Sequence, residues 1–310
     1  MTKTTLFSTA ALLAGLTAGN AMAATVFSED WDDGAGASRW SAPLPFQEEP
    51  AITFDGSVDY AFDYSTIGAA PAPGTIGGTT IGVAMETNTT DQCPSGIGCT
   101  DSDEGEAVAI IPNSFILPAG DYTLTADVYM FWNGGGGSTE YSGIGVHTDA
   151  VSGAPLRFGL NTPNGLNWQV DSDGDTGDDI IRYEGGIGQT GLGGYEAIPD
   201  GSIPGVVTGP SKIGPYNQWV TLSIVNSGGT VTFAMNGYVI DSFDNTGGIF
   251  SGGSIMLSAS DPFNSVNVDD IFGYSNLQVF DNIKVTDVPE PASMALLALG
   301  GLAMLRRRSA

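Results

Sequence analysis

Hydrophobic and polar residues alternate along several short segments of this chain, and almost no segment shows the period of an amphipathic helix. Successive side chains of a β-strand point to opposite faces, so alternation predicts strands with one buried face. The pattern predicts strands at residues 122–131, 219–225, 230–235, 238–243, 254–259 and 277–285. Asn236 and Gly237 separate two of these strands and form the strongest local hairpin signal, because a type I′ turn needs positive φ at both central residues.

Glycine and proline mark the turns between these strands. Most of the 45 glycines and 17 prolines lie between the apolar segments. Short strands with regular turns predict an all-β fold, an antiparallel β-sandwich, and the length suits one such domain. The hydrophobic content of 41% argues against a disordered chain.

The two ends of the chain differ from this body. Residues 1–23 combine Lys3, an apolar run at 6–16 and the small residues Ala21 and Ala23, which is the pattern of a helical secretory signal peptide that is removed on export. At the other end, an apolar segment at 292–305 precedes a basic cluster. As a helix, this segment would reach about 21 Å of the roughly 30 Å hydrocarbon core, so it is short for a permanent anchor.

The C-terminal residues resemble a known sorting signal. Pro289, Glu290 and Pro291, the short apolar helix, and the cluster Arg306, Arg307 and Arg308 occur in the order of the PEP-CTERM signal. The resemblance implies cleavage by an exosortase, after transient insertion into the inner membrane of a Gram-negative bacterium that makes extracellular polysaccharide. It divides the chain into a signal peptide at 1–23, a β-sandwich domain at 24–288 and a sorting signal at 289–310. An ordinary tail anchor is the alternative interpretation.

The chain is strongly acidic, with 35 Asp and Glu against 9 Lys and Arg and a net charge of −26. Since Lys3, Glu290 and the three C-terminal arginines lie in the terminal segments, the body keeps 5 basic and 34 acidic residues. Nucleic acid is excluded as a partner, because no basic patch can displace phosphate counterions. The imbalance favours solubility and the binding of divalent cations.

A second resemblance concerns the body. This resemblance rests on the segment 27–31, Trp219 at the start of a strand, the hairpin 230–243, the strand at 254–259 and the closing segment 280–285. Together they are similar to concanavalin A-like lectin and glucanase jelly rolls, the laminin-G type included. Members of that superfamily bind glycans or proteins, and some hydrolyse polysaccharides, so the fold alone does not choose a function.

The residues do not favour an enzyme. Laminarinase-type members carry their catalytic glutamates in a Glu-x-Asp-x-x-Glu strand, and this spacing is absent. Glu104 and Glu106 are the nearest pair of carboxylates, and we interpret them as a solvated acidic loop. His147 is the single histidine, which excludes a three-histidine zinc site and leaves one possible base for a serine triad. We therefore expect a non-catalytic protein.

Calcium is the expected cofactor, with a structural role. The segment 171–179 reads DSDGDTGDD and resembles the calcium loops of extracellular modules, in which a short turn wraps oxygen ligands around the ion. Its candidate ligands are Asp171, Asp173, Asp175, Asp178 and Asp179. A solvated acidic turn is the alternative. A second, weaker candidate site joins Glu29 or Asp30 to Asp281, since the first and last strands of such jelly rolls often neighbour each other.

Tryptophan and cysteine complete the candidates. Trp132 and Trp168 flank loops and are candidates for stacking on sugar rings, although each could equally cover a loop. Trp31, Trp40 and Trp219 lie in apolar patterns and are expected in the core. Cys93 and Cys99 are the only cysteines, and in an exported protein they predict a disulfide that closes a small loop.

These expectations combine into one hypothesis with two alternatives. The chain is expected to be an exported protein of the cell envelope or extracellular matrix that binds exopolysaccharide or another matrix component. The alternatives are a structural acidic matrix protein without a specific ligand and a glycan hydrolase. An aromatic concave binding face would favour the first interpretation.

Overall fold

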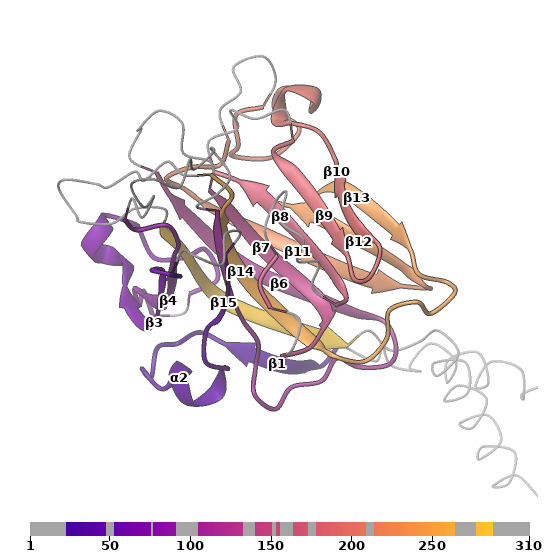
Figure 1. The fold of residues 1–310 in the computed structure, drawn as a ribbon, viewed down its shortest axis with the longest axis horizontal. Helices are drawn as coiled ribbons and strands as arrows, with labels where there is room; N and C mark the ends of the chain where they lie inside the picture. The colour runs from indigo at the N-terminus through magenta and orange to yellow at the C-terminus, as the bar shows by residue number, and fades with distance from the viewer. Residues whose placement is uncertain are drawn as a thin grey trace, which may run out of the picture.

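The computed structural model describes residues 23–47, 53–75, 77–90, 105–132, 140–150, 153–155, 164–172, 178–208, 214–263 and 277–287. Two antiparallel β-sheets lie face to face (Figure 1). The first has the strand order β13-β12-β11-β6-β15-β4-β3, with β1 also paired to β15, and the second has the order β10-β9-β8-β7-β14-β5-β2. The prediction of an all-β antiparallel sandwich is therefore confirmed.

The eight-stranded sheet comprises β1 (Thr25–Glu29), β3 (Ser57–Asp63), β4 (Ile81–Glu86), β6 (Tyr122–Phe131), β11 (Trp219–Ser227), β12 (Thr230–Met235), β13 (Tyr238–Asp244) and β15 (Leu277–Asp287). The seven-stranded sheet comprises β2 (Leu44–Gln47), β5 (Glu106–Ile110), β7 (Tyr141–Thr148), β8 (Leu166–Asp171), β9 (Ile180–Glu184), β10 (Gly188–Gly191) and β14 (Ser254–Asp261). The described helical turns are α2 (Gly36–Arg39), η1 (Tyr64–Ile67) and η2 (Tyr195–Ala197).

The strands expected from alternation are all present, and each ends within two residues of its expected bounds. The hairpin between β12 and β13 has the turn that its sequence predicts, because Asn236 has φ 48° and Gly237 has φ 81°. Local turn chemistry thus fixes the register of this edge of the sheet, in which Met235 pairs with Tyr238.

Alternation places one face of each central strand in the core. On β6, Leu124, Ala126, Val128 and Met130 are fully buried between the sheets. The other face of the eight-stranded sheet is divided. Part of it is covered by an apolar cluster that includes Tyr64 of η1, and the rest carries polar side chains.

Strand β15 organises the polar part of that face. It pairs with β6 along most of its length, with β4 through residues 278–280 and with β1 through residues 283–286. The register with β6 shifts between Asp281 and Lys284, where Asn282 has φ 52°. A bulge of this kind bends a strand and redirects its side chains. The pairing of β1 with β15 also confirms that the first and last strands of the body are neighbours.

The ends of the body are joined to each other. The Ala24 amide donates to Asp287 Oδ1 at 2.8 Å, and the Asp287 amide donates to the Ala24 carbonyl at 2.9 Å. Every described strand lies between Thr25 and Asp287, so we expect residues 24–288 to fold as one unit. In the part of the chain that the structure describes, no helix has the length and apolar character needed to span a membrane.

Candidate functional site

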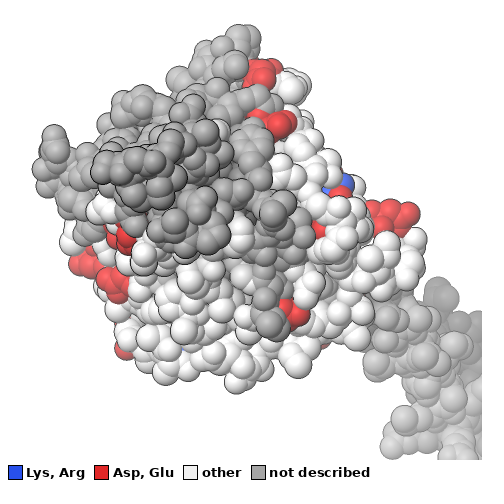
Figure 2. All heavy atoms as spheres, in the orientation of Figure 1, with Lys and Arg blue, Asp and Glu red and all other residues white. Residues whose placement is uncertain are grey.

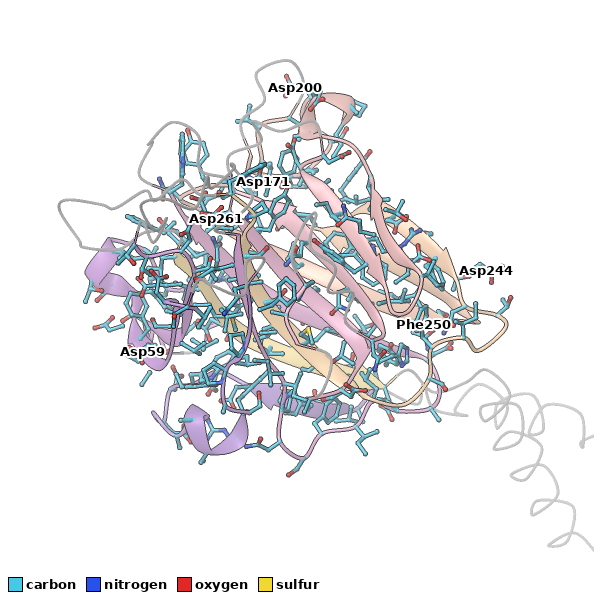
Figure 3. The ribbon with its side chains drawn as sticks, in the orientation of Figure 1. Asp59, Asp171, Asp200, Asp244, Phe250 and Asp261 are labelled. Carbon is cyan, nitrogen blue, oxygen red and sulfur yellow. The ribbon has the colours of Figure 1, made fainter. Side chains whose placement is uncertain are left out.

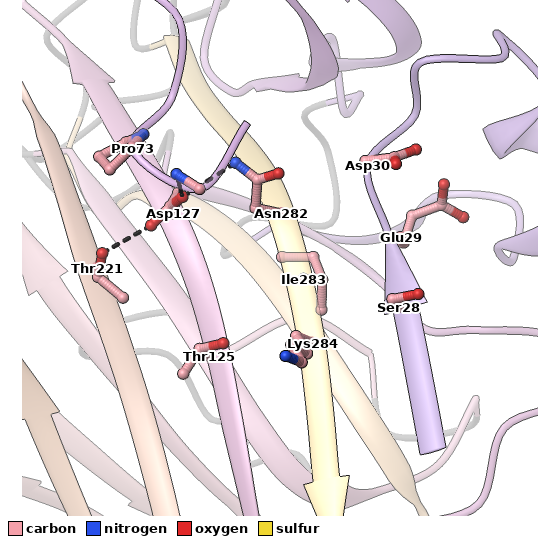
Figure 4. Close-up of a pocket in the computed structure, with 11 residues that line it drawn as sticks. Ser28, Glu29, Asp30, Pro73, Thr125, Asp127, Thr221, Asn282, Ile283 and Lys284 are labelled. Atoms are coloured by element: carbon pink, nitrogen blue, oxygen red, sulfur yellow. Dashed lines mark hydrogen bonds between the residues drawn. The ribbon is translucent and has the colours of Figure 1, made fainter. Parts of the chain in front are cut away.

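A groove of about 580 Å³ lies on the outer face of the eight-stranded sheet, where β1, β15, β6 and β11 run side by side (Figure 4). Its volume is within the range of about 300–1,000 Å³ that is common for ligand sites. The groove is lined by Ser28, Glu29, Asp30, Pro73, Gly74, Thr125, Asp127, Thr221, Asn282, Ile283 and Lys284.

Asp127 forms the base of this groove. Its carboxylate accepts hydrogen bonds from the Thr221 hydroxyl at 2.6 Å, the Gly74 amide at 3.1 Å and the Asn282 side-chain amide at 3.0 Å. The side chain is only 5% exposed, so these three donors compensate the cost of burying its charge. Asp127 therefore fixes the walls of the groove relative to each other (Figure 4).

The conformation of Asn282 follows from its place in the bulge. Asparagine tolerates the left-handed region better than most residues, because its short side chain can bond locally. Its Nδ2 donates to Asp127 Oδ2 at 3.0 Å and to Thr75 Oγ1 at 3.1 Å. These bonds use both amide protons, and the carbonyl oxygen Oδ1 is left as an acceptor in the groove wall.

Asp281 lies beside the groove but is buried under η1. Its carboxyl group is contacted by the Tyr64 hydroxyl at 3.0 Å, the Thr75 hydroxyl at 3.3 Å and the Asn282 amide at 2.7 Å. Burial raises the pKa of Asp281 to about 7. The Tyr64 hydroxyl has one proton, and the Thr79 carbonyl at 3.0 Å is a second acceptor for it. A protonated Asp281 can donate to the Tyr64 oxygen while Tyr64 donates to the Thr79 carbonyl.

Glu29 at the end of β1 forms an ion pair with Arg39. Its carboxylate is held by Arg39, with Nε to Oε2 and Nη2 to Oε1 both at 2.6 Å, and Trp40 Nε1 donates to it at 3.2 Å. A guanidinium therefore already neutralises Glu29, and the second candidate calcium site, of Glu29 or Asp30 with Asp281, stays a prediction. Asp30 is exposed at the rim of the groove, and Asp281 has the contacts described above. Among the described residues, no three His, Cys, Asp or Glu side chains gather as a metal site.

The acidic loop at 171–179 is described only at its two ends. Asp171, labelled in Figure 3, and Asp179 are fully buried. The Asp171 amide donates to the Asp179 carbonyl at 2.7 Å. Asp179 Oδ2 accepts from the Tyr195 amide at 2.6 Å, and Asp178 is half-buried. The other two candidate ligands, Asp173 and Asp175, lie outside the described residues, so the calcium site remains a prediction.

The tryptophans divide into two groups. Trp168 is fully buried, stacks on Phe233 at 5.6 Å and donates to Asp241 at 2.8 Å, which contradicts the expectation that it stacks on sugars. Trp31 and Trp40 are core residues as predicted. Trp219 is only partly buried and packs on the cluster beneath η1.

Trp132, the other tryptophan proposed to contact sugars, lies at the end of β6. Its ring meets Tyr216 edge-on at 4.7 Å and is half-buried. It does not line the groove, so its role in ligand binding remains a prediction.

Two residues considered in the enzymatic interpretation have structural roles. Glu106 is 1% exposed in β5, which corrects its assignment to a solvated loop, and burial raises its pKa to about 7. It accepts from the backbone amides of Asn88 at 2.9 Å and Asp55 at 3.1 Å. His147 bonds through both ring nitrogens, to Tyr122 Oη at 2.9 Å and the Gly252 carbonyl at 2.8 Å, and burial lowers its pKa. Glu104 lies outside the described residues.

The remaining expectations also concern residues outside the described part of the chain. They are the disulfide between Cys93 and Cys99, the signal peptide through residue 22, the apolar helix at 292–305 and the sorting residues 289–291 and 306–308. Their structural aspects stay predictions.

Comparison with known proteins confirms the sorting signal. The model of the PEP-CTERM protein-sorting motif matches residues 287–309, so the chain carries this motif. The motif indicates export and sorting to the cell surface in bacteria. No curated protein matches the sequence.

Several solved structures have a similar fold, and three of them are a carbohydrate-binding module, the catalytic domain of a laminarinase and an exoplasmic domain. They are the carbohydrate-binding module CBM66 from Bacillus subtilis (13% identity, 61% of this chain and 89% of that chain, TM-score 0.35), the laminarinase catalytic domain from Thermotoga maritima (10%, 86% and 99%, 0.44) and the metal-free exoplasmic domain of VIP36 (14%, 87% and 95%, 0.42). The activities in these names belong to those proteins. The fold of this chain is defined by its own strand pairings.

Sequence reasoning missed most of the groove. Asp127, Thr125 and Thr221 are polar residues on the outer faces of strands that were predicted correctly. A polar outer face is the ordinary expectation for a sandwich, so nothing marks these residues individually. The one local signal is Asn282 within a strand, because asparagine is disfavoured there and often indicates a bulge or turn.

Proposed function

We propose that the body of this protein is a non-catalytic polysaccharide-binding module, displayed at the bacterial surface or in the extracellular matrix. The observation that carries the proposal is the groove over β15, whose base is fixed by Asp127. Polysaccharides present hydroxyl groups and patches of C–H bonds to a protein. A site for them needs hydrogen-bonding groups held in place and some apolar wall.

The groove offers both kinds of surface. Asn282 Oδ1 and the Asp30 carboxylate are acceptors, and the hydroxyls of Ser28 and Thr125 can donate or accept. Pro73 provides apolar lining. Because β1, β15, β6 and β11 hold these groups on a paired sheet, the site is organised before a ligand arrives, which lowers the entropic cost of binding.

The hydrogen bonds and ion pairs of the carboxylates near the groove support a module without catalytic activity. Glycoside hydrolysis needs one carboxyl group to protonate the leaving oxygen and a second to act as nucleophile or base. In the groove, Asp127 is occupied by three donors and Glu29 by Arg39. Asp281, with its raised pKa, does not line the groove.

Processing and calcium form the remaining parts of the proposal. An exosortase would recognise Pro289, Glu290 and Pro291 and remove the tail after export, so that the tail anchors the chain in the inner membrane only transiently. Calcium would bind the acidic loop at 171–179, where closely spaced carboxylates repel one another without a cation. Both parts rest on residues outside the groove.

The function is tested by retention on immobilised bacterial exopolysaccharides. Purified residues 24–288 would be applied to a panel with calcium and with EDTA, and released reducing sugar would be assayed in the same samples. We expect retention on at least one polysaccharide without sugar release, and weaker retention with EDTA because the acidic loop loses its cation. Absence of retention throughout would contradict glycan binding, and sugar release would contradict the non-catalytic role. Retention that EDTA leaves unchanged would contradict only the calcium.

A further inference from the structure

Lys284 is unusual among the basic residues that the structure describes. These residues are Arg39, Arg182 and Lys284. Arg39 is paired with Glu29 and Asp33, and Arg182 with Glu184 and Asp241. Lys284 is exposed, lines the groove and makes no ion pair with a described residue. An acidic protein therefore leaves this ammonium group unpaired inside its candidate binding site.

The neighbours of Lys284 form a donor-rich end of the groove. Lys284 pairs in register with Ser28 on β1 and with Thr125 on β6, so both hydroxyls lie on its face of the sheet (Figure 4). Three carboxylates line the groove. Asp127 is engaged by its three donors and Glu29 by Arg39, and Asp30 lies exposed at the rim. An ammonium flanked by two hydroxyls is a suitable cradle for a carboxylate.

The charge of the whole protein matters for an anionic ligand. The net charge of −26 opposes the approach of anions, and acidic side chains outnumber basic ones on the face shown in Figure 2, but the screening length of about 8 Å at physiological ionic strength limits this repulsion to short range. A single carboxylate within a sugar ring can approach Lys284 at contact distance while the rest of the ring meets Asn282 and Asp30.

We propose that Lys284, Ser28 and Thr125 form a carboxylate subsite, so that the groove selects polysaccharides containing uronic acid over neutral polymers. This inference rests on the proposed glycan binding and adds the class of sugar. The carboxylate lies at the Lys284 end of the groove, and the ring hydroxyls lie at the end formed by Asn282 and Asp127.

The test compares uronic acid oligosaccharides with their carboxyl-reduced forms, which keep the linkages and lose the charge. Oligomers of polygalacturonate, alginate and hyaluronan would be titrated calorimetrically into residues 24–288 at 0.15 M salt. We expect at least one charged oligomer to bind tenfold or more tightly than its reduced form. Lys284→Gln should remove this preference, so that the charged oligomer and its reduced form bind with similar affinity.

A matched control separates the local contact from net charge. Ile187→Glu, at a side chain that is 64% exposed between β9 and β10, changes the net charge by the same amount as Lys284→Gln. It should keep the wild-type preference. Equal affinity of the wild type for both forms would overturn the subsite and leave glycan binding intact, as would a preference that survives Lys284→Gln. If the wild type binds no probe but is retained on a neutral exopolysaccharide, the subsite alone fails. If it binds neither probes nor the panel, both proposals fail.

Discussion

Replacing Arg182 by methionine is expected to lower the free energy of unfolding by about 3–5 kcal/mol, because two carboxylates in a mostly buried site lose their counter-ion. Arg182 on β9 binds Asp241 on β13 at 2.6 Å and Glu184 at 2.7 Å, and these side chains are 11–14% exposed. The network therefore joins the two sheets. Trp168 adds a hydrogen bond to Asp241, and the guanidinium lies 5.4 Å from the centre of the Phe243 ring.

Thermal and denaturant unfolding of residues 24–288 would measure this effect. At about 2–4 °C per kcal/mol for a domain of this size, the midpoint should fall by roughly 10 °C. Lys284→Met, at an exposed residue that forms no ion pair with the described part of the chain, should change the stability by less than about 0.5 kcal/mol. The triple variant Arg182→Met, Glu184→Gln, Asp241→Asn should recover most of the loss, since no charge remains uncompensated. A midpoint for Arg182→Met within 2 °C of the wild type would contradict the role of this network.

The protein is expected to be more stable at pH 5 than at pH 8, because Asp281 and Glu106 each contribute up to about 3 kcal/mol and together outweigh the opposing effect of His147, whose pKa burial lowers. Burial raises the pKa of each carboxyl group to about 7 in the folded state, above the usual 3.8 and 4.5. Between the usual and the raised pKa, the folded state binds a proton that the unfolded state does not. The stabilisation is therefore complete below the usual pKa and is lost as the pH rises towards about 7.

Asp281→Asn tests the contribution of one group. The amide is permanently neutral and nearly the same shape, so the difference in melting temperature between pH 5 and pH 8 should shrink. Asp244→Asn is the control, because Asp244 is exposed and its pKa is lowered by hydrogen bonds from Thr246. A wild type equally stable at both pH values would contradict the account, as would a pH dependence that Asp281→Asn leaves intact.

The sequence predicts the strands of the eight-stranded sheet better than those of the other sheet. The strand at 122–131 and the hairpin around Asn236 have clear alternation and a turn that only one backbone conformation satisfies. In β7 the corresponding positions hold Gly143 and Gly145, which have weak strand propensity. They are small because Ser258, Gln169 and Asn167 pack closely against them, a contact between distant segments that local pattern does not reveal.

The candidate site shows the same limit. Trp168 was proposed as a ligand contact, although Leu166, Trp168 and Val170 alternate with polar residues, which already indicates a core-facing position. The neighbouring strands β1 and β15 were anticipated, but the partner of Glu29 was not. Arg39 reaches it from α2, and no spacing rule connects the two residues. The groove itself requires side chains from segments near residues 28, 73, 125, 221 and 283 to meet.

The most direct test of the central claim fills the groove and leaves the fold intact. Thr125→Trp places an indole among the groove residues on the outer face of β6. Thr123→Trp makes the same change on the same strand and face, two residues outside the groove. For the polysaccharide that best retains the wild type, titration calorimetry should show at least tenfold weaker binding, about 1.4 kcal/mol, for Thr125→Trp and less than twofold change for Thr123→Trp. Wild-type affinity in Thr125→Trp, with both variants folded, would contradict glycan binding in this groove.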